Sequence, residues 1–287
     1  MLVLCVIFAL LGAASNATGT VLQRKAALTV PAKDALKVRL VMDLVKQPVW
    51  LLGICGVAGA ALFQALALVT GPLALAQPVF ILELPFALLI ALPVLHRSLP
   101  TSGWYAVGCM VAGLVLALAS AAPTGGSSQA SMARWIPAVV ACVAGTAVAV
   151  GLARHRPSGA VRAALLGSAA AVANALTAAL LKSAADTFSD KGFGAFLATW
   201  QTYGFVVAGV TAVFLLENAL QAGPIAASQP ALTLGDATVS LLLGVAVYDE
   251  HIRTGWWLVP ELAGIGLIIS GTLYLSRAVP LTRELGN

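Results

Sequence analysis

The stretch GPLALAQP (Gly71–Pro78) returns 152 residues later as GPIAASQP (Gly223–Pro230). The same offset pairs Gly103-Trp104 with Gly255-Trp256, and a register one residue shorter pairs Ala112-Gly113 with Ala263-Gly264. Chance rarely matches two Gly-Pro, two Gln-Pro and two Gly-Trp pairs in one register. The sequence therefore predicts an internal duplication.

The composition is typical of a membrane protein. The 287 residues are 60% hydrophobic and only 9% charged, with a mean hydropathy of +0.96, whereas a soluble domain needs far more charge to cover its surface. The first apolar run has no preceding positive charge, which predicts a retained helix rather than a cleaved signal peptide. The four cysteines lie in four different apolar runs without disulfide or metal spacing, and we expect buried thiols: Cys5, Cys55, Cys109 and Cys142.

The hydropathy predicts an all-α fold, a polytopic membrane helix bundle of about nine transmembrane helices. Roughly 20 apolar residues cross a bilayer as a helix. The predicted spans are 2–22, 47–69, 72–95, 101–121, 134–153, 160–182, 194–217, 222–247 and 255–276. The chain then divides into a first repeat (1–121), a linker with a central helix (122–159) and a second repeat (160–287).

This plan of four plus one plus four helices makes the repeat an inverted one. An odd number of helices separates the start of one repeat from the start of the other, so the second repeat enters from the opposite side of the membrane. Inverted repeats around a midplane binding site are typical of secondary transporters.

The basic residues predict the orientation. If the N-terminus lies outside, twelve of the sixteen Lys and Arg residues fall on the cytoplasmic side, which favours an N-out, C-in topology in the cell (inner or plasma) membrane. Segment 32–46 carries Leu at every fourth position and charges on its other side. This pattern predicts an amphipathic helix on the cytoplasmic interface, with an ordinary charged connector as the alternative.

Two carboxylates inside the spans are the main functional signals. Glu83 and Asp236 lie 11 and 12 residues after the prolines of the repeated Gly-Pro pairs, about 16 and 18 Å along their helices. A carboxylate at a helix centre costs roughly 2.5–3.5 kcal/mol on insertion scales, so such residues are functional candidates. The alternative is a structural carboxylate bonded to a neighbouring helix. Glu261, close to Trp256-Trp257, is predicted to be shallower and to have a packing role.

Amides and prolines recur around these carboxylates in both halves. A proline removes a backbone hydrogen bond and frees a carbonyl one turn earlier, and a glutamine brings both a donor and an acceptor. The glutamines therefore either line a midplane site or satisfy the backbone freed by their own prolines, and the asparagines either line the cavity or join helices. The predicted binding residues are Glu83, Asp236, Gln77, Gln229, Asn16 and Asn174, and the predicted helix breaks are Pro78, Pro230 and Pro85.

Other classes of function have little support in the sequence. It contains neither a Walker A loop for ATP nor an HExxH zinc motif, and His96, His155 and His251 fall at span ends or in loops. We expect no enzymatic activity, no cofactor and no nucleic-acid partner. The expected partners are the lipid bilayer and a small-molecule or ion substrate. The oligomeric state stays open, a homodimer included.

The architecture, the inverted repeat and the GPLALAQP helix start resemble the drug/metabolite transporter superfamily (EamA-like). Within it, the first half is similar to NIPA-type magnesium transporters, through the stretches TGTVLQRKAAL, WLLGICGVAGAALFQALAL and TGPLALAQPVFILELPFALLIALPVLHRSL. The common superfamily plan is ten helices as five plus five, so the predicted nine are a departure; nine is the count usually proposed for the NIPA type.

These observations predict a secondary transporter of a small solute that works by alternating access around a midplane site. The alternatives are a NIPA-like carrier of magnesium or another divalent cation, and a structural or assembly protein that transports nothing. Glu83 and Asp236 are predicted to couple transport to a cation, either H⁺ or the substrate ion itself. If that ion is Mg²⁺, the two carboxylates would supply oxygen ligands.

Overall fold

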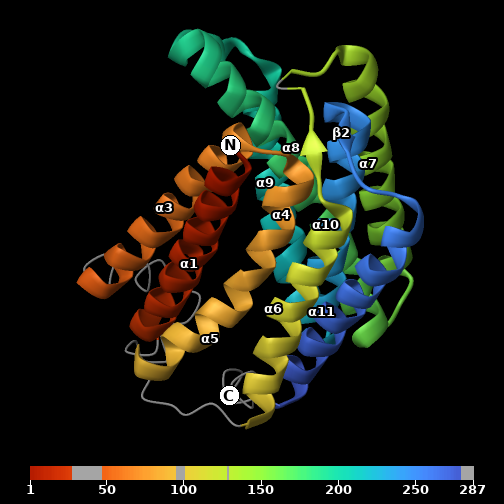
Figure 1. Cartoon of the computed structure of the whole chain (residues 1–287). Coiled ribbons are helices and arrows are strands. Elements are labelled where there is room, and N and C mark those ends of the chain that lie inside the picture. Colours follow the sequence, from red (N-terminus) through yellow and green to blue (C-terminus); the bar gives the residue numbers. More distant parts are fainter. Residues whose placement is uncertain (28–46, 95–100, 128, 279–287) are drawn as a thin grey trace.

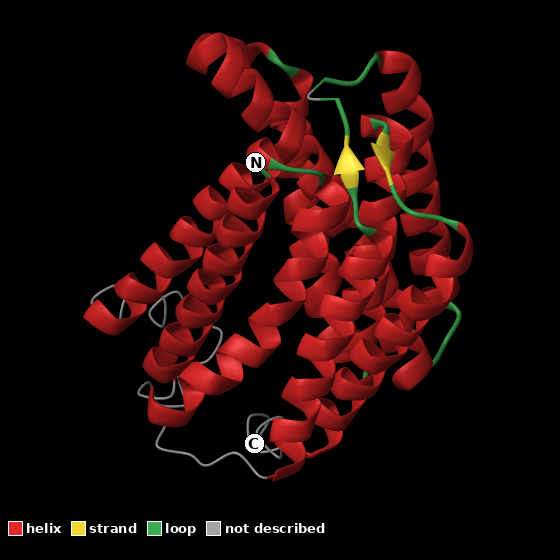
Figure 2. Cartoon of the chain, viewed as in Figure 1, coloured by secondary structure: helices red, strands yellow, loops and turns green. Residues whose placement is uncertain are grey.

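The computed structural model describes residues 1–27, 47–94, 101–127 and 129–278 (Figure 1). The predicted interfacial segment 32–46 and His96 lie outside these ranges. Figure 2 shows that the described chain is built almost entirely of helices. Within the described residues, nine spans are long and apolar enough to cross a membrane, which confirms the predicted fold class.

The elements follow one another in chain order. The helices are α1 (Leu2–Ala27), α3 (Pro48–Thr70), α4 (Leu73–Val79), the 3₁₀ turn η2 (Phe80–Leu82), α5 (Glu83–Val94), α6 (Thr101–Ala121), α7 (Met132–Arg154), α8 (Ala160–Ala198), α9 (Trp200–Ala222), α10 (Ile225–Tyr248), the 3₁₀ turn η3 (Gly255–Trp257) and α11 (Leu258–Ala278). The strands β1 (Thr124–Gly125) and β2 (Glu250–His251) form one short antiparallel pair.

The predicted boundaries are wrong at α8. This helix continues well past the predicted end at residue 182, to Ala198, and the next helix begins at Trp200 instead of residue 194. A kink at Gly192 (φ 78°) divides α8. Glycine permits this left-handed conformation at little cost, and the segment after it projects beyond the bundle (Figure 1).

The two ends of the bundle are distinguished by where the helix breaks lie. The first end carries Met1, the break at Thr70–Pro72 and Glu250, and we call it the Glu250 end. The opposite end carries the break at Gly223–Pro224, and we call it the Pro224 end. In Figure 1, α1 begins at the Glu250 end and α11 finishes at the Pro224 end.

The repeats are inverted in the structure. Helix α4 begins at the Glu250 end and α10 finishes there: the N–H groups of Leu73 and Ala74 bond to Glu250, two residues after α10. Between α6 and α11, a Cβ on Gly113 would meet the Gly264 carbonyl at 2.6 Å, and a Cβ on Gly264 would meet the Gly113 carbonyl at 2.6 Å. Two glycines that the repeat pairs thus contact each other reciprocally, as residues beside a twofold axis do.

Small residues set the helix spacing in both repeats. Ser15 Oγ on α1 donates to the Gly56 carbonyl on α3 at 2.8 Å, and a Cβ on Gly19 would lie only 2.8 Å from the Gly53 carbonyl. In the second repeat α8 packs against α9, and alanines of both helices share one buried cluster. Lipid supplies no hydrophobic force between helices, so close backbone packing is the main source of association.

The predicted symmetry of helix breaks is wrong in one half. The first repeat bends at η2, which lies between Pro78 and Pro85, whereas α10 continues without interruption through Pro230. Pro85 cannot donate to the carbonyl four residues earlier, which lies inside η2. The repeat offset places Ala237 where the first half has Pro85. The interrupted helix of the first repeat therefore differs from the continuous α10 by a second proline, Pro85.

Candidate functional site

Each predicted midmembrane carboxylate is paired with the asparagine of its own repeat. Asn174 Nδ2 on α8 donates to Asp236 Oδ2 on α10 at 3.0 Å, and Ser240 Oγ lies 3.5 Å from Asp236 Oδ1. Asn16 on α1 lies beside Glu83 at the start of α5, where its side chain interacts with the carboxyl group. We call these two contacts the Asn–carboxylate pairs.

The Asn–carboxylate pairs occupy equivalent places in the inverted repeat. Glu83 is 10 residues past the start of α4, and Asp236 is 12 residues before the end of α10. At 1.5 Å per residue both lie about 15–18 Å from the Glu250 end, near the middle of a bilayer whose apolar core is about 30 Å thick. Both predicted carboxylates and both predicted asparagines therefore belong to one construction that is used twice.

Gln77 adds a buried donor to this region. Its side chain is 2% exposed, and among the described residues its Nε2 has no hydrogen-bond partner. On antiparallel α4 and α10, Ala74 faces Gly244, and Ile81 shares a cluster with Ala237. Gln77 lies between the two contacts on α4, and Ser240 lies between them on α10. The free amide is thus at the depth of Ser240, one turn from Asp236.

The other predicted polar residues are placed differently. Gln229 is half-buried, and its backbone carbonyl accepts a hydrogen bond from Thr233 Oγ1 at 2.8 Å. Glu261 is 8% exposed in the first turn of α11, and its Oε2 has no partner among the described residues. Its burial against the bundle fits the predicted packing position. The described residues contain no group of three His, Cys, Asp or Glu side chains that converge as metal ligands.

A second polar cluster, at the break between α3 and α4, escaped sequence reasoning. Lys182 Nζ on α8 donates to the carbonyls of Leu68 and Gly71 at 3.0 and 2.6 Å. The Glu250 carboxylate accepts from the N–H groups of Leu73 and Ala74 at 2.6 and 2.8 Å. Lys182 Nζ and Glu250 Oε1 are 3.7 Å apart. We call this arrangement the Lys182–Glu250 clamp.

The clamp satisfies groups that the helix break would otherwise leave without partners. The last carbonyls of a helix carry partial negative charge and the first N–H groups carry partial positive charge. The ammonium meets the first set and the carboxylate meets the second. Burial raises the pKa of Glu250 above its usual value, while the N–H of Ala74, the Lys182 ammonium and the N–H of Leu73 counteract that increase.

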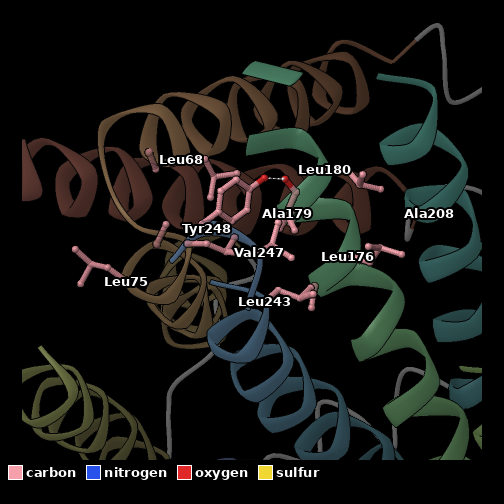
Figure 3. Close-up of a cluster of buried hydrophobic side chains, with 14 of the residues drawn as sticks. Leu68, Leu75, Leu176, Ala179, Leu180, Ala208, Leu243, Val247 and Tyr248 are labelled. Atoms are coloured by element: carbon pink, nitrogen blue, oxygen red, sulfur yellow. Dashed lines mark hydrogen bonds between the residues drawn. The ribbon is translucent and has the colours of Figure 1, made fainter. Parts of the chain in front are cut away.

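Tyr248 packs the clamp against the core. Its hydroxyl donates to the Ala179 carbonyl at 2.5 Å, and its ring lies 5.3 Å from Lys182 Nζ. Figure 3 shows this hydrogen bond within the cluster of buried apolar side chains that includes Leu68 and Val247. The Trp135 ring meets Tyr248 edge-on, with ring centroids 6.0 Å apart. The charges of the clamp therefore sit in an apolar surround.

Two extramembrane segments close over the clamp. The Gly125–Glu250 pair in the β1–β2 ladder and the bond from Ser127 N to the Tyr248 carbonyl, at 2.6 Å, join the interrepeat linker to the end of α10. Gly126 has φ 105°, and a Cβ there would lie 2.9 Å from Glu250 Cγ. Glycine is thus required both by the backbone and by the close approach of the carboxylate.

The sequence held only a weak signal for the clamp. Lys182 lies in the small-residue run LLKSAAD, and Glu250 lies in the charged end YDEH. Each is ordinary for a span end, where basic and acidic side chains reach the interface. Their partners are backbone groups more than 100 residues away, and no local pattern predicts such partners.

Comparison with known proteins gives one informative match. The chain is similar to an uncharacterized protein of Corynebacterium glutamicum, with 28% identity over 280 residues that cover 96% of this chain and 95% of that protein. The likeness therefore extends across both repeats and the linker between them. No family model matches the chain, and no solved structure matches it.

Proposed function

We propose that this chain is a secondary transporter of a small solute, which works by alternating access around the two Asn–carboxylate pairs. The observation that carries the proposal is their equivalence: Asn16–Glu83 and Asn174–Asp236 join the first and third helices of two inverted repeats. Polar groups at the repeat interface near the midplane are where such transporters bind substrate and coupling ion.

The chemistry of the region favours a solute that is itself a cation or whose transport is coupled to a cation. Two carboxylates at this depth are costly unless they face a polar cavity, a partner or a bound cation. Their asparagine partners are neutral, so neither pair cancels a negative charge. The free Gln77 amide offers a hydrogen bond to the same ligand. The proposed cation is either H⁺, as the coupling ion, or Mg²⁺, as the transported ion. Mg²⁺ fits two carboxylates because it binds through one or two carboxylates and keeps several waters.

The membrane orientation completes the proposal. The proposed orientation has the N-terminus outside and the C-terminus inside, which the distribution of basic residues favours. The Glu250 end then faces the exterior and the Pro224 end faces the cytoplasm. The likeness to drug/metabolite transporters and to the NIPA branch agrees with this arrangement, and the cell membrane is the proposed location.

The test replaces each carboxylate by its amide. Glu83→Gln and Asp236→Asn keep shape and remove charge. Ligands are first sought by the rise in Tm of purified wild-type protein with MgCl₂ or with a panel of cationic and zwitterionic metabolites, since a ligand that binds only the folded state stabilises it. Uptake of the stabilising compound, or of Mg²⁺, is then measured in proteoliposomes with and without a pH gradient.

We expect both variants to fold and insert but to lose coupled uptake by about a hundredfold or more, because the coupling charge is absent. Glu217→Gln, which changes an exposed carboxylate on α9, is the matched control and should transport normally. Wild-type rates in either carboxylate variant between about pH 6 and 8 would remove that residue from the mechanism. A chain that no compound stabilises and that moves no solute would instead be a structural or assembly protein.

A further inference from the structure

We propose that the Lys182–Glu250 clamp is the gate of the transporter at the Glu250 end. All contacts of the clamp are made in the structure, and under this proposal the clamp must release the break between α3 and α4 before the Asn–carboxylate pairs open to that side. The inference rests on the transport function proposed above, and it adds the residues that control access from one side.

The first step is that the clamp joins the two repeats. Lys182 and Glu250 belong to the second repeat, and the four backbone groups that they bind belong to the first. Lys182 is 6% exposed and Glu250 is 3% exposed. A buried pair of this kind holds only while its geometry is complete, because removal of one partner leaves an uncompensated charge. It therefore suits a contact that is either fully made or fully released.

The second step concerns the third helix of the first repeat, which consists of α4 and α5. This helix contacts the second repeat mainly through α4, at the Glu250 end. Helix α4 packs against α10 beside the clamp, whereas α5, beyond the bend, packs against α1 of its own repeat. Figure 1 shows α5 leaving the line of α10 and following α1. Alternating access in inverted repeats is largely a rocking of one unit against the other around a fixed site. Opening at the Glu250 end therefore requires the contact there to separate.

The third step is that the equivalent break in the second repeat is held by a different contact. At the Pro224 end the Gly159 N–H donates to the Ala222 carbonyl at 2.7 Å, next to Gly223. A Cβ on Gly223 would collide with the backbone of Gly159. Among the described residues, this backbone contact of Gly159 is thus what holds the break at the Pro224 end, and the rocking motion would have to release it when that end opens.

The chain contains its own reporter for this gate. Cys5 on α1 is 0% exposed, and a Cβ on Gly71 would come within 2.5 Å of its Sγ. The thiol therefore lies directly against the break that the clamp holds. Release of the break would expose Cys5 to water, whereas Cys142, which is buried on α7, would stay covered.

The experiment measures the reaction of Cys5 with a membrane-impermeant methanethiosulfonate reagent. Full-length protein in nanodiscs, where both faces are accessible, carries Cys55→Ala, Cys109→Ala and Cys142→Ala, so that Cys5 is the remaining cysteine. Lys182→Met, Glu250→Gln and their combination are compared in this background. Asp249→Asn is the matched control, because Asp249 pairs with Arg134 at the exposed surface beside the clamp and Asn also accepts its positive φ.

We expect each single change to raise the Cys5 reaction rate by about a hundredfold, because one buried charge is left without its partner. The combined change should raise the rate no further than a single one, since coupled residues are not additive. Asp249→Asn should leave the rate unchanged. A matched set that keeps Cys142 in place of Cys5 should stay unreactive, which separates a local gate from general loosening.

Three results would overturn the gate. One is an unreactive Cys5 in both single variants; another is a rise in reactivity at Cys142 equal to that at Cys5. The third is failure of both single variants to insert while Asp249→Asn inserts normally, because a contact that cannot be broken without loss of the fold is not a gate. None of these outcomes bears on transport itself, which the Glu83 and Asp236 variants test separately.

Discussion

At the scale of single residues, the neighbourhood decides what each carboxylate can do. Glu83 and Asp236 each have a neutral asparagine partner, which leaves their negative charge available to a cation. Glu250 has an ammonium and two N–H groups, and its charge holds a helix break in place. The half-buried Glu83 and Asp236 thus differ from the buried Glu250, whose charge is matched by the groups of the helix break.

Glu250 gives the protein a pH dependence whose sign follows from its burial. The folded protein binds more protons than the unfolded chain between the ordinary pKa and the raised one, so the free energy of unfolding falls as pH rises through that window. Lys182→Met removes a cation that lowers this pKa and so extends the window upwards. On acidification from about pH 8 to about pH 5 we expect the Tm of Lys182→Met to gain about 3–6 °C more than wild type.

The control for this pH dependence is the combined change Lys182→Met with Glu250→Gln. It removes the titrating group and should return the Tm–pH profile to one parallel with that of Glu250→Gln alone. Because Lys182→Met also removes a cation that acts on Asp186, every chain in this comparison, wild type included, carries Asp186→Asn; His251 and the Arg134–Asp249 pair are the same in every variant. Equal profiles for wild type and Lys182→Met would show that Glu250 does not titrate in this range.

At the scale of secondary structure, the bend in the third helix of the first repeat separates two otherwise equivalent units. Two prolines bracket η2, whereas α10 has one proline and continues through it as a single helix. Before the bend, α4 packs against α10; after the bend, α5 packs against α1. The asymmetry of the two repeats thus begins with one side chain, Pro85, which lacks a counterpart at Ala237.

Pro85→Ala should straighten this helix and bring α5 towards the second repeat. The replacement restores the donor that η2 lacks and removes the ring clash, which together cost about 3 kcal/mol in a helix interior. Pulsed electron spin resonance between labels at Ala91→Cys and Tyr274→Cys would report a shorter distance. Pro230→Ala should leave that distance unchanged, because α10 is already continuous through this proline. An unchanged distance in Pro85→Ala would mean that packing on α1, not proline, causes the bend.

At the scale of the whole molecule, an inverted repeat gives the bundle two ends that are related but not identical. The Glu250 end is closed by charged side chains and by the β1–β2 pair, and the Pro224 end is joined through backbone contacts of Gly159. The α6–α11 contact at Gly113 and Gly264 lies where the two repeats meet.

The topology can be tested directly on this frame. Cysteines at Ser127 in the interrepeat linker and at His155 after α7 lie at opposite ends of the bundle. In intact cells whose protein lacks other accessible cysteines, an impermeant maleimide should label position 127 and leave position 155 unlabelled until the membrane is permeabilised. We expect position 155 to be cytoplasmic because most basic residues lie on the Pro224 side of the bundle. The reverse pattern would establish an N-in orientation, and labelling at both positions in intact cells would contradict the bundle.

The sequence by itself determined the helical membrane fold, the nine spans and the inverted repeat, because hydropathy and an internal duplication are properties of the chain read locally. It also marked Glu83, Asp236, Asn16 and Asn174 as candidates, since polar residues inside apolar runs are costly wherever they end up. Segment boundaries were less secure: the kink at Gly192 let α8 extend far past its predicted end.

Only the tertiary structure decided which groups meet. The pairing of each asparagine with the carboxylate of its own repeat depends on how α1 and α8 pack against the third helices. The Lys182–Glu250 clamp joins an ammonium, a carboxylate and four backbone groups from three distant segments. Backbone acceptors and donors are the same at every residue, so no sequence pattern marks the ones that a helix break exposes. Their positions follow only once the helices are packed.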